Sequence, residues 1–201
     1  MGGTMTAESV EHRHHWPVPP VDGYTVDDLF TLPDLPPHTE LIDGSLITVG
    51  PQRNFHADVI DLLVSGLRRD MPKKFRVKRE MTIVLDRRNG PEPDVSVVFA
   101  EAVRGPDQTG YQAQDVLLAV EVVSPDSESR DRTTKPQKYA AAGIPHFWRV
   151  ERDGTGGSPL VHVYERDPLT LTYVHMGMHR DRIKVDHPYA IDIDLTAVTE
   201  L

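Results

Sequence analysis

Two acidic residues stand at the ends of two apolar, strand-like runs, and this pattern constrains the fold more than any other feature. Asp94 precedes the run 95–99, and Glu121 lies near the end of the run 117–123. Short valine-rich runs bounded by turn residues are typical of buried strands. If the two strands are neighbours in a sheet, the two carboxylates meet at one place.

Carboxylates among apolar residues need partners, because burial of an unpaired charge is costly. One Mg²⁺ ion would serve Asp94 and Glu121 together, since it prefers oxygen ligands and few protein carboxylates. Such an ion activates water and offsets the charge of a phosphate. Lys135 could orient that water, and Tyr139, four residues on, shares its helical face. These are the residue types that a metal-dependent phosphodiesterase needs, but strand-end acids more commonly serve as caps or ion-pair partners and a lone lysine is commonly solvated.

Composition bounds the possible classes of protein. A length of 201 residues predicts one domain with a sizeable core. The absence of cysteine excludes disulfides and thiolate metal sites. No apolar stretch approaches the roughly 20 residues of a membrane helix, and the N-terminus lacks the pattern of a secretory signal, so we expect a cytoplasmic protein with no membrane segment. The net charge of -9 argues against avid non-specific binding to nucleic acid, but a local basic patch can still hold a substrate.

Turn signals divide the chain into a tail and one domain. Residues 1–22 carry three clustered histidines, His12, His14 and His15, and several prolines. We interpret this segment as a flexible, solvated tail rather than a metal site. Residues 23–201 are expected to form a single domain.

Periodicity and turn residues place the elements of that domain. Asp-Gly between two apolar runs predicts a hairpin, and a proline near one end and a glycine after the other bracket a helix. The predicted helices are 25–32 with Thr25 as cap, 54–69 with Asn54 as cap, and 136–142 ending at Gly143. Strands are predicted within 73–85 and at 94–99, 116–123 and 146–150, and hairpins at 40–49 and 160–175. The segment 124–132 is predicted to be a polar loop, and 183–195 a last strand-like stretch. This order indicates an α/β or α+β sheet domain.

The densest basic run has two interpretations. Lys73, Lys74, Arg76, Lys78 and Arg79 surround Phe75 and could grip a phosphate backbone. We prefer a solvated strand face, with Phe75 and Val77 in the core. Trp148, beside Phe147 in a predicted strand, is also expected in the core.

Taken together, the ordered motifs resemble the Uma-two family of restriction-endonuclease-like proteins in the PD-(D/E)XK nuclease superfamily. The resemblance runs from about residue 24 to about residue 165. It rests on Glu40-Leu-Ile-Asp-Gly, His56 at a helix start, Pro93-Asp94-Val95, Glu121-Val-Val-Ser-Pro, Asp131-Arg132, Lys135, Tyr139, and the stretch from Gly143 to Val150. It implies an α/β fold with a restriction-endonuclease-like core, in which helices flank a mixed central sheet.

The resemblance also implies roles for individual residues. Asp94 and Glu121 would be the metal-binding acids, and the backbone carbonyl of Val122 a further ligand. Glu40 would be an additional acid. The superfamily places its lysine two residues after the second acid, where this chain has Val123. Lys135 is therefore the expected substitute, with Lys138 as second choice.

Three further residues are candidates for contacting the substrate: His56, Ser124 and Tyr139. His56 could contact a phosphate or a metal-bound water, or could simply cap its helix. Ser124 could bond Glu121, although a role in the following turn is favoured.

The function that the resemblance implies is Mg²⁺-dependent hydrolysis of phosphodiester bonds, with Mn²⁺ as a substitute ion and DNA favoured over RNA. A homodimer is expected, because duplex cleavage uses two sites. The alternative is a non-catalytic module that binds nucleic acid or protein on the same fold. A metal-dependent enzyme acting on a small phosphorylated molecule is a third hypothesis.

Overall fold

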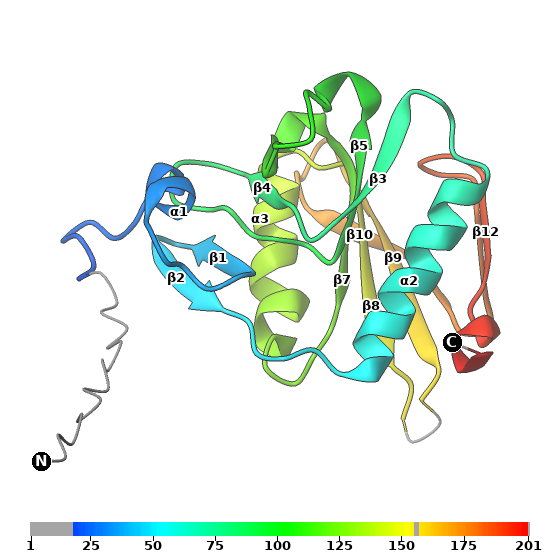
Figure 1. The fold of residues 1–201 in the computed structure, drawn as a ribbon. Coiled ribbons are helices and arrows are strands. Elements are labelled where there is room, and N and C mark those ends of the chain that lie inside the picture. Colours follow the sequence, from blue (N-terminus) through cyan, green and yellow to red (C-terminus); the bar gives the residue numbers. More distant parts are fainter. Residues whose placement is uncertain (1–17, 155–156, 201) are drawn as a thin grey trace, which may run out of the picture.

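A six-stranded mixed sheet forms the centre of the molecule, and a helix covers each of its faces (Figure 1). The computed structural model describes residues 18–154 and 157–200. The predicted histidine cluster in the tail lies outside the described residues. Within them, no helix combines the length and apolar character that crossing a membrane requires.

The α-helices and strands are numbered in chain order. The α-helices are α1 (Val26–Thr31), α2 (Asn54–Arg69) and α3 (Lys135–Ala141), and a π-helical turn, η3 (Arg130–Thr134), leads into α3. The strands are β1 (Thr39–Ile42), β2 (Ser45–Thr48), β3 (Phe75–Arg79), β4 (Thr82–Val84), β5 (Val95–Phe99), β6 (Gly110–Gln112), β7 (Val116–Val122), β8 (His146–Arg152), β9 (Pro159–Arg166), β10 (Tyr173–His179), β11 (Arg182–Val185) and β12 (Ile191–Asp194).

The sheet topology makes β5 and β7 neighbours. The strand order is β10-β9-β8-β7-β5-β3, and all neighbouring pairs are antiparallel except β7 and β8. Parallel strands need a crossover connection, and here α3 supplies it. The crossover holds α3 against one face of the sheet, while α2 lies on the other (Figure 1).

Alternation along β7 sends its side chains to two different environments. Leu118, Val120 and Val122 belong to the apolar core beneath α2. Ala119 belongs to the smaller cluster on the α3 side. Because successive strand residues point to opposite faces, Glu121 also points to the α3 side.

Local turn chemistry builds the N-terminal part as predicted. Thr25 caps α1 through a capping box with Asp28. The β1–β2 hairpin turns at Asp43 and Gly44, whose φ angles of 51° and 77° are the left-handed pair that Asp-Gly adopts readily. Leu41 exchanges backbone hydrogen bonds with Gly90, and this pairing fixes the hairpin beside the segment that leads into β5.

Several sequence predictions are confirmed. Phe75 and Val77 are buried, which supports the solvated-face interpretation of the basic run, and Trp148 is fully buried. The third helix stops before Gly143, whose φ is 93°.

Other predictions are wrong in detail. Arg53 rather than Asn54 is the N-cap of α2, and it makes no side-chain capping bond. The segment 124–132 is not wholly a loop, since η3 begins at Arg130. The final stretch forms the two-stranded β11–β12 hairpin. An additional short strand, β6, lies between the predicted strands 94–99 and 116–123 and pairs in parallel with β4.

Candidate active site

Glu121 is buried on the α3 side of β7, where two residues of α3 engage both of its oxygens. The Tyr139 hydroxyl donates to Oε1 at 2.6 Å, and the Lys135 ammonium donates to Oε2 at 3.1 Å. The two helix residues share one face because they are four positions apart. Alternation in β7 and helical periodicity in α3 therefore bring these three side chains together.

Lys135 is buried and lies among three carboxylates. Its ammonium nitrogen lies 2.8 Å from Glu40 Oε1, 3.1 Å from Glu121 Oε2 and 3.3 Å from Asp131 Oδ1. Asp131 has no role in the sequence predictions, although its spacing of four from Lys135 is a recognisable signal. The π-helical turn carries Asp131, and single-turn π-helices are frequent at functional sites.

Glu40 reaches the site from outside the central sheet, on the β1–β2 hairpin. Its Oε1 atom accepts a hydrogen bond of 2.9 Å from the backbone N–H of Glu92. The Glu92 carboxylate in turn lies 2.5 Å from Nδ1 of His38. The Leu41–Gly90 pairing and these contacts fix Glu40 beside the start of β5.

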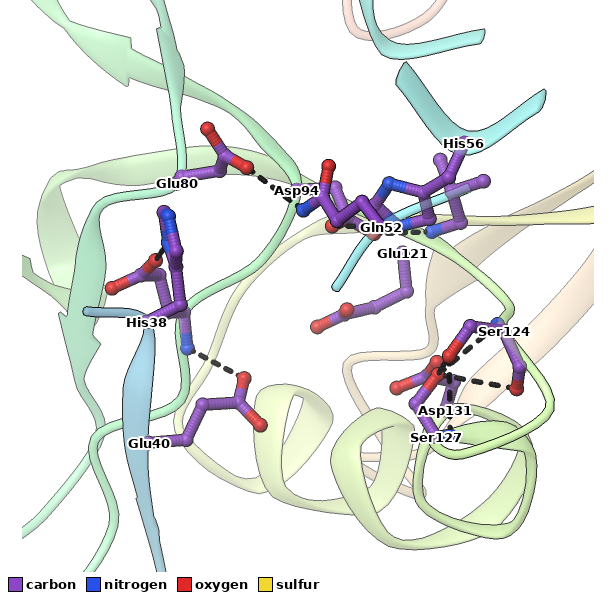
Figure 2. Close-up of polar contacts among 12 residues, drawn as sticks. His38, Glu40, Gln52, His56, Glu80, Asp94, Glu121, Ser124, Ser127 and Asp131 are labelled. Carbon is purple, nitrogen blue, oxygen red and sulfur yellow. Dashed lines mark hydrogen bonds and ion pairs between the residues drawn. The ribbon is translucent and has the colours of Figure 1, made fainter. Parts of the chain in front are cut away.

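Asp94 directly precedes β5 and lies beside the end of β7. Its Oδ2 atom accepts a hydrogen bond of 2.6 Å from the Val122 N–H. Its Oδ1 atom lies 3.1 Å from Nε2 of His56, in the first turn of α2. Figure 2 shows the carboxylates of Glu40, Glu121 and Asp131 directed toward the space between them.

The site holds more negative than positive charge. Asp94, Glu121, Glu40 and Asp131 stand against one lysine and one histidine. Burial raises the pKa of Glu121 well above its usual value, although Lys135 opposes that shift. Burial likewise raises the pKa of Asp131.

Neighbouring acids favour the charged form of both basic groups. Burial works against the Lys135 ammonium, but Glu121, Glu40 and Asp131 outweigh it and raise its pKa well above the ordinary value. Burial also works against charged His56, but the bond to Asp94 and nearby acids raise the pKa of the imidazole. Lys135 therefore acts as a fixed positive charge rather than as a base near neutral pH.

The donor set suits a hard divalent cation chemically. Carboxylate oxygens are the ligands Mg²⁺ prefers, and buried Glu40 Oε2 has no hydrogen-bond partner within the described part of the chain. Within the same part, no three acidic or histidine side chains already form a metal-binding group. Lys135 and Tyr139 hold Glu121, so binding a cation there requires the carboxylate to exchange one of these partners.

The remaining predicted residues have different surroundings. Ser124 forms a turn with Ser127, with hydroxyl oxygens 2.9 Å apart, as the turn interpretation proposed. Val122 contacts Asp94 through its N–H. Lys138, the second-choice lysine, instead lies 2.5 Å from the exposed Asp43 carboxylate.

Comparison with known proteins places this chain in a family. A family model described as "Uma2: Putative restriction endonuclease" matches residues 26–195. The fold is shared with a solved structure described as a "putative nuclease belonging to DUF820 from Anabaena variabilis ATCC 29413", at 17% identity and a TM-score of 0.56, covering 88% of this chain and 92% of the other. The predicted restriction-endonuclease-like α/β core is thereby confirmed. A search of curated proteins finds no match. Since the family model spans most of its length, the chain belongs to the Uma2 family.

Proposed function

We propose that this protein is a Mg²⁺-dependent endonuclease that hydrolyses phosphodiester bonds in DNA, with Mn²⁺ able to replace Mg²⁺. Family membership supports a nuclease. The observation that carries the proposal is the buried Lys135 ammonium, held by three carboxylates beside Asp94. Strongly perturbed ionisable groups of this kind cluster at functional sites.

Asp94 and Glu121 would hold the divalent cation, with the Val122 carbonyl as a further ligand. When bound, the cation would activate water and offset the charge of the reacting phosphate. The excess of acidic groups supports this role, because a cation relieves repulsion among neighbouring carboxylates.

Lys135 and Glu40 would support the acids in different ways. Lys135 is charged near neutral pH and lies against Glu121, so it can attract the phosphate or orient the attacking water. Glu40 fixes the lysine position at 2.8 Å and is itself held by a backbone N–H. Tyr139 donates to Glu121 and thereby orients that carboxylate.

His56 would contribute positive charge near the substrate. Its raised pKa favours the imidazolium form as pH falls toward neutrality, and its ring lies against Asp94. A phosphate that approaches Asp94 would therefore meet His56 as well as Lys135. A homodimer would place two such sites on the two strands of a duplex.

A non-catalytic binding module on the same fold is the second candidate. The supporting observation is that Lys135 and Tyr139 already occupy both oxygens of Glu121. A binding module would keep this arrangement as a purely structural charge cluster.

Cleavage assays distinguish the two candidates. The full chain is incubated with plasmid DNA, single-stranded DNA or RNA, with Mg²⁺ or Mn²⁺, beside Asp94→Asn and Glu121→Gln. Asp107→Asn, in an exposed loop between β5 and β6, is the matched control. The nuclease proposal expects cleavage of DNA by the wild type and the control and its loss in both site variants. Equal residual cleavage by all four proteins would contradict it.

A further inference from the structure

A pocket of about 270 Å³ opens beside the candidate active site. Its walls are the segment 49–53, which leads into α2, and the segment 123–126, which follows β7. The two walls face one another closely, since a Cβ atom added at Gly50 would lie 3.5 Å from the Asp126 carboxylate. The lining is completed by the first turn of α2, by the end of β8, and by Glu128 and Arg132.

The pocket and the active site share residues. His56 lines the pocket and lies 3.1 Å from Asp94. Val123, another lining residue, directly follows Val122, whose N–H donates to Asp94. A ligand group in the pocket would therefore be adjacent to a phosphate held at Asp94.

The lining combines flat and apolar groups with charges of both signs: the arginines are Arg53, Arg132 and Arg152, and the acids are Asp126, Glu128 and Glu151. Phe55 is partly buried, and the Arg152 guanidinium lies 5.8 Å from the centre of its ring. Pro51 and Pro125 add apolar surface. Arg53 is exposed at the rim and makes no ion pair with any described residue. Aromatic rings and guanidinium planes are the groups on which proteins stack unpaired bases.

The size of the pocket suits one base better than a larger ligand. Pockets for small molecules commonly begin at about 300 Å³, slightly above the volume here. A double helix cannot enter such a space, whereas a base taken out of the stack can.

We propose that this pocket receives one nucleobase, unstacked from its neighbours and adjacent to the scissile phosphate, by stacking on Phe55 and Arg152. The inference rests on the proposed nuclease function and adds a preference for single-stranded or locally opened nucleic acid. An extruded base must be unstacked at a cost, and that cost is least where the strand is already unpaired.

Binding measurements with abasic oligonucleotides test this proposal without requiring cleavage. Fluorescent single strands of about 12 nucleotides, within the roughly 4–16 that single-strand sites cover, carry one abasic position moved along the strand. Anisotropy in Ca²⁺, which also takes oxygen ligands, gives the affinity of the full chain. The variants are Phe55→Leu, which keeps an apolar side chain without the ring, and Arg152→Ala. Phe30→Leu and Arg104→Ala, at exposed positions away from the pocket, are matched controls.

The proposal expects one position at which base removal weakens wild-type binding by roughly 5- to 150-fold, the range for loss of one stacked base. At that position base removal should weaken binding less in Phe55→Leu and in Arg152→Ala than in the wild type, because each variant has already lost one of the two stacking partners. Both controls should behave as wild type. Uniform effects along the strand, unchanged effects in the variants, or no single-strand binding at all would overturn it.

Failures of the two proposals are distinguishable. Cleavage that depends on Asp94, together with uniform abasic effects along the strand, would contradict the base-pocket proposal and support the nuclease proposal. A position-specific abasic effect that depends on Phe55 would support the pocket even if Asp94→Asn left cleavage unchanged, in which case the binding-module function would stand.

Discussion

The two sides of β7 are equally buried but chemically opposite. On the α2 side, Val120 and Val122 pack among aliphatic and aromatic residues of the main core. On the α3 side, Glu121 meets Lys135 and Tyr139. The first arrangement stabilises the fold through apolar burial. Buried ion pairs commonly stabilise no better than well-packed apolar residues, so the charged side points to function rather than to folding.

The largest expected difference comes from removing the central lysine. Lys135→Met leaves Glu40, Glu121 and Asp131 without their cation and should cost about 3–5 kcal/mol of unfolding free energy near neutral pH. Acidification should reduce this cost, because protonation of the carboxylates removes the uncompensated charge. Urea denaturation at several pH values provides the measurement.

Lys138→Met is the matched control for this change. Lys138 lies three positions along the same helix, and its partner Asp43 is exposed, so the loss should stay below about 1 kcal/mol. Similar losses for both variants would mean that the buried charges contribute no more than a surface pair.

The apolar side should respond without pH dependence. Leu63→Ala removes a fully buried side chain of α2 and should cost about 2–5 kcal/mol. No ionisable group changes partner in Leu63→Ala. Its loss of unfolding free energy should therefore stay constant over the pH range in which the loss caused by Lys135→Met changes. A pH-dependent loss at Leu63 would show that the two sides are energetically coupled.

Paired tyrosine variants compare one hydrogen bond on each side. Tyr139→Phe removes a donor to buried Glu121 and should cost about 1.5–3 kcal/mol. Tyr189→Phe removes a bond of 2.8 Å to the Leu67 carbonyl on the α2 side and should cost about 0.5–1.5 kcal/mol. Thermal or urea unfolding of both variants measures the two losses of unfolding free energy. A larger loss for Tyr189→Phe than for Tyr139→Phe would contradict the expectation that the hydrogen bond to the carboxylate is the stronger one.

The smallest expected effect lies at the margin of the charged side, at His38. Its hydrogen bond to Glu92 is the main cause of its raised pKa. The contribution of His38 to stability is therefore full below the unfolded-state pKa, about 6.5, and is lost as pH rises through the higher folded-state pKa. Since the imidazole is about half exposed, His38→Gln should cost only a few tenths of a kcal/mol at mildly acidic pH and nothing at alkaline pH. A loss that grows with pH would contradict this assignment.

Local signals in the sequence predicted the elements that local chemistry determines. Thr25, the Asp43-Gly44 turn and Gly143 act through their own backbone neighbourhoods, and the structure has each as predicted. The three-residue strand β6 has no periodic signal and exists because β4 lies beside it. The helix α2 spans 54–69 as predicted, but its N-cap is Arg53, whose extended backbone is determined by the path of the preceding loop rather than by Asn54.

The candidate site was only partly accessible to sequence reasoning. Alternation in β7 and the spacing of Lys135 and Tyr139 suffice to place these side chains on facing surfaces. The position of Glu40 in the site depends on the tertiary pairing of Leu41 with Gly90, for which the sequence carries no local signal. The contact between His56 and Asp94 joins the first turn of α2 to the start of β5. It likewise results from tertiary packing rather than from a local sequence signal.

Titration with Mn²⁺ tests the proposed metal-dependent role of the charged side most directly. Calorimetry on the full chain near neutral pH should show Mn²⁺ binding, because the site holds more acidic than basic groups and carboxylate oxygens suit this cation. Asp94→Asn and Glu121→Gln should lose this binding, and Asp107→Asn should keep it. Absence of Mn²⁺ binding by the wild type, or equal binding by the site variants, would contradict the assignment of a metal-dependent active site to Asp94 and Glu121.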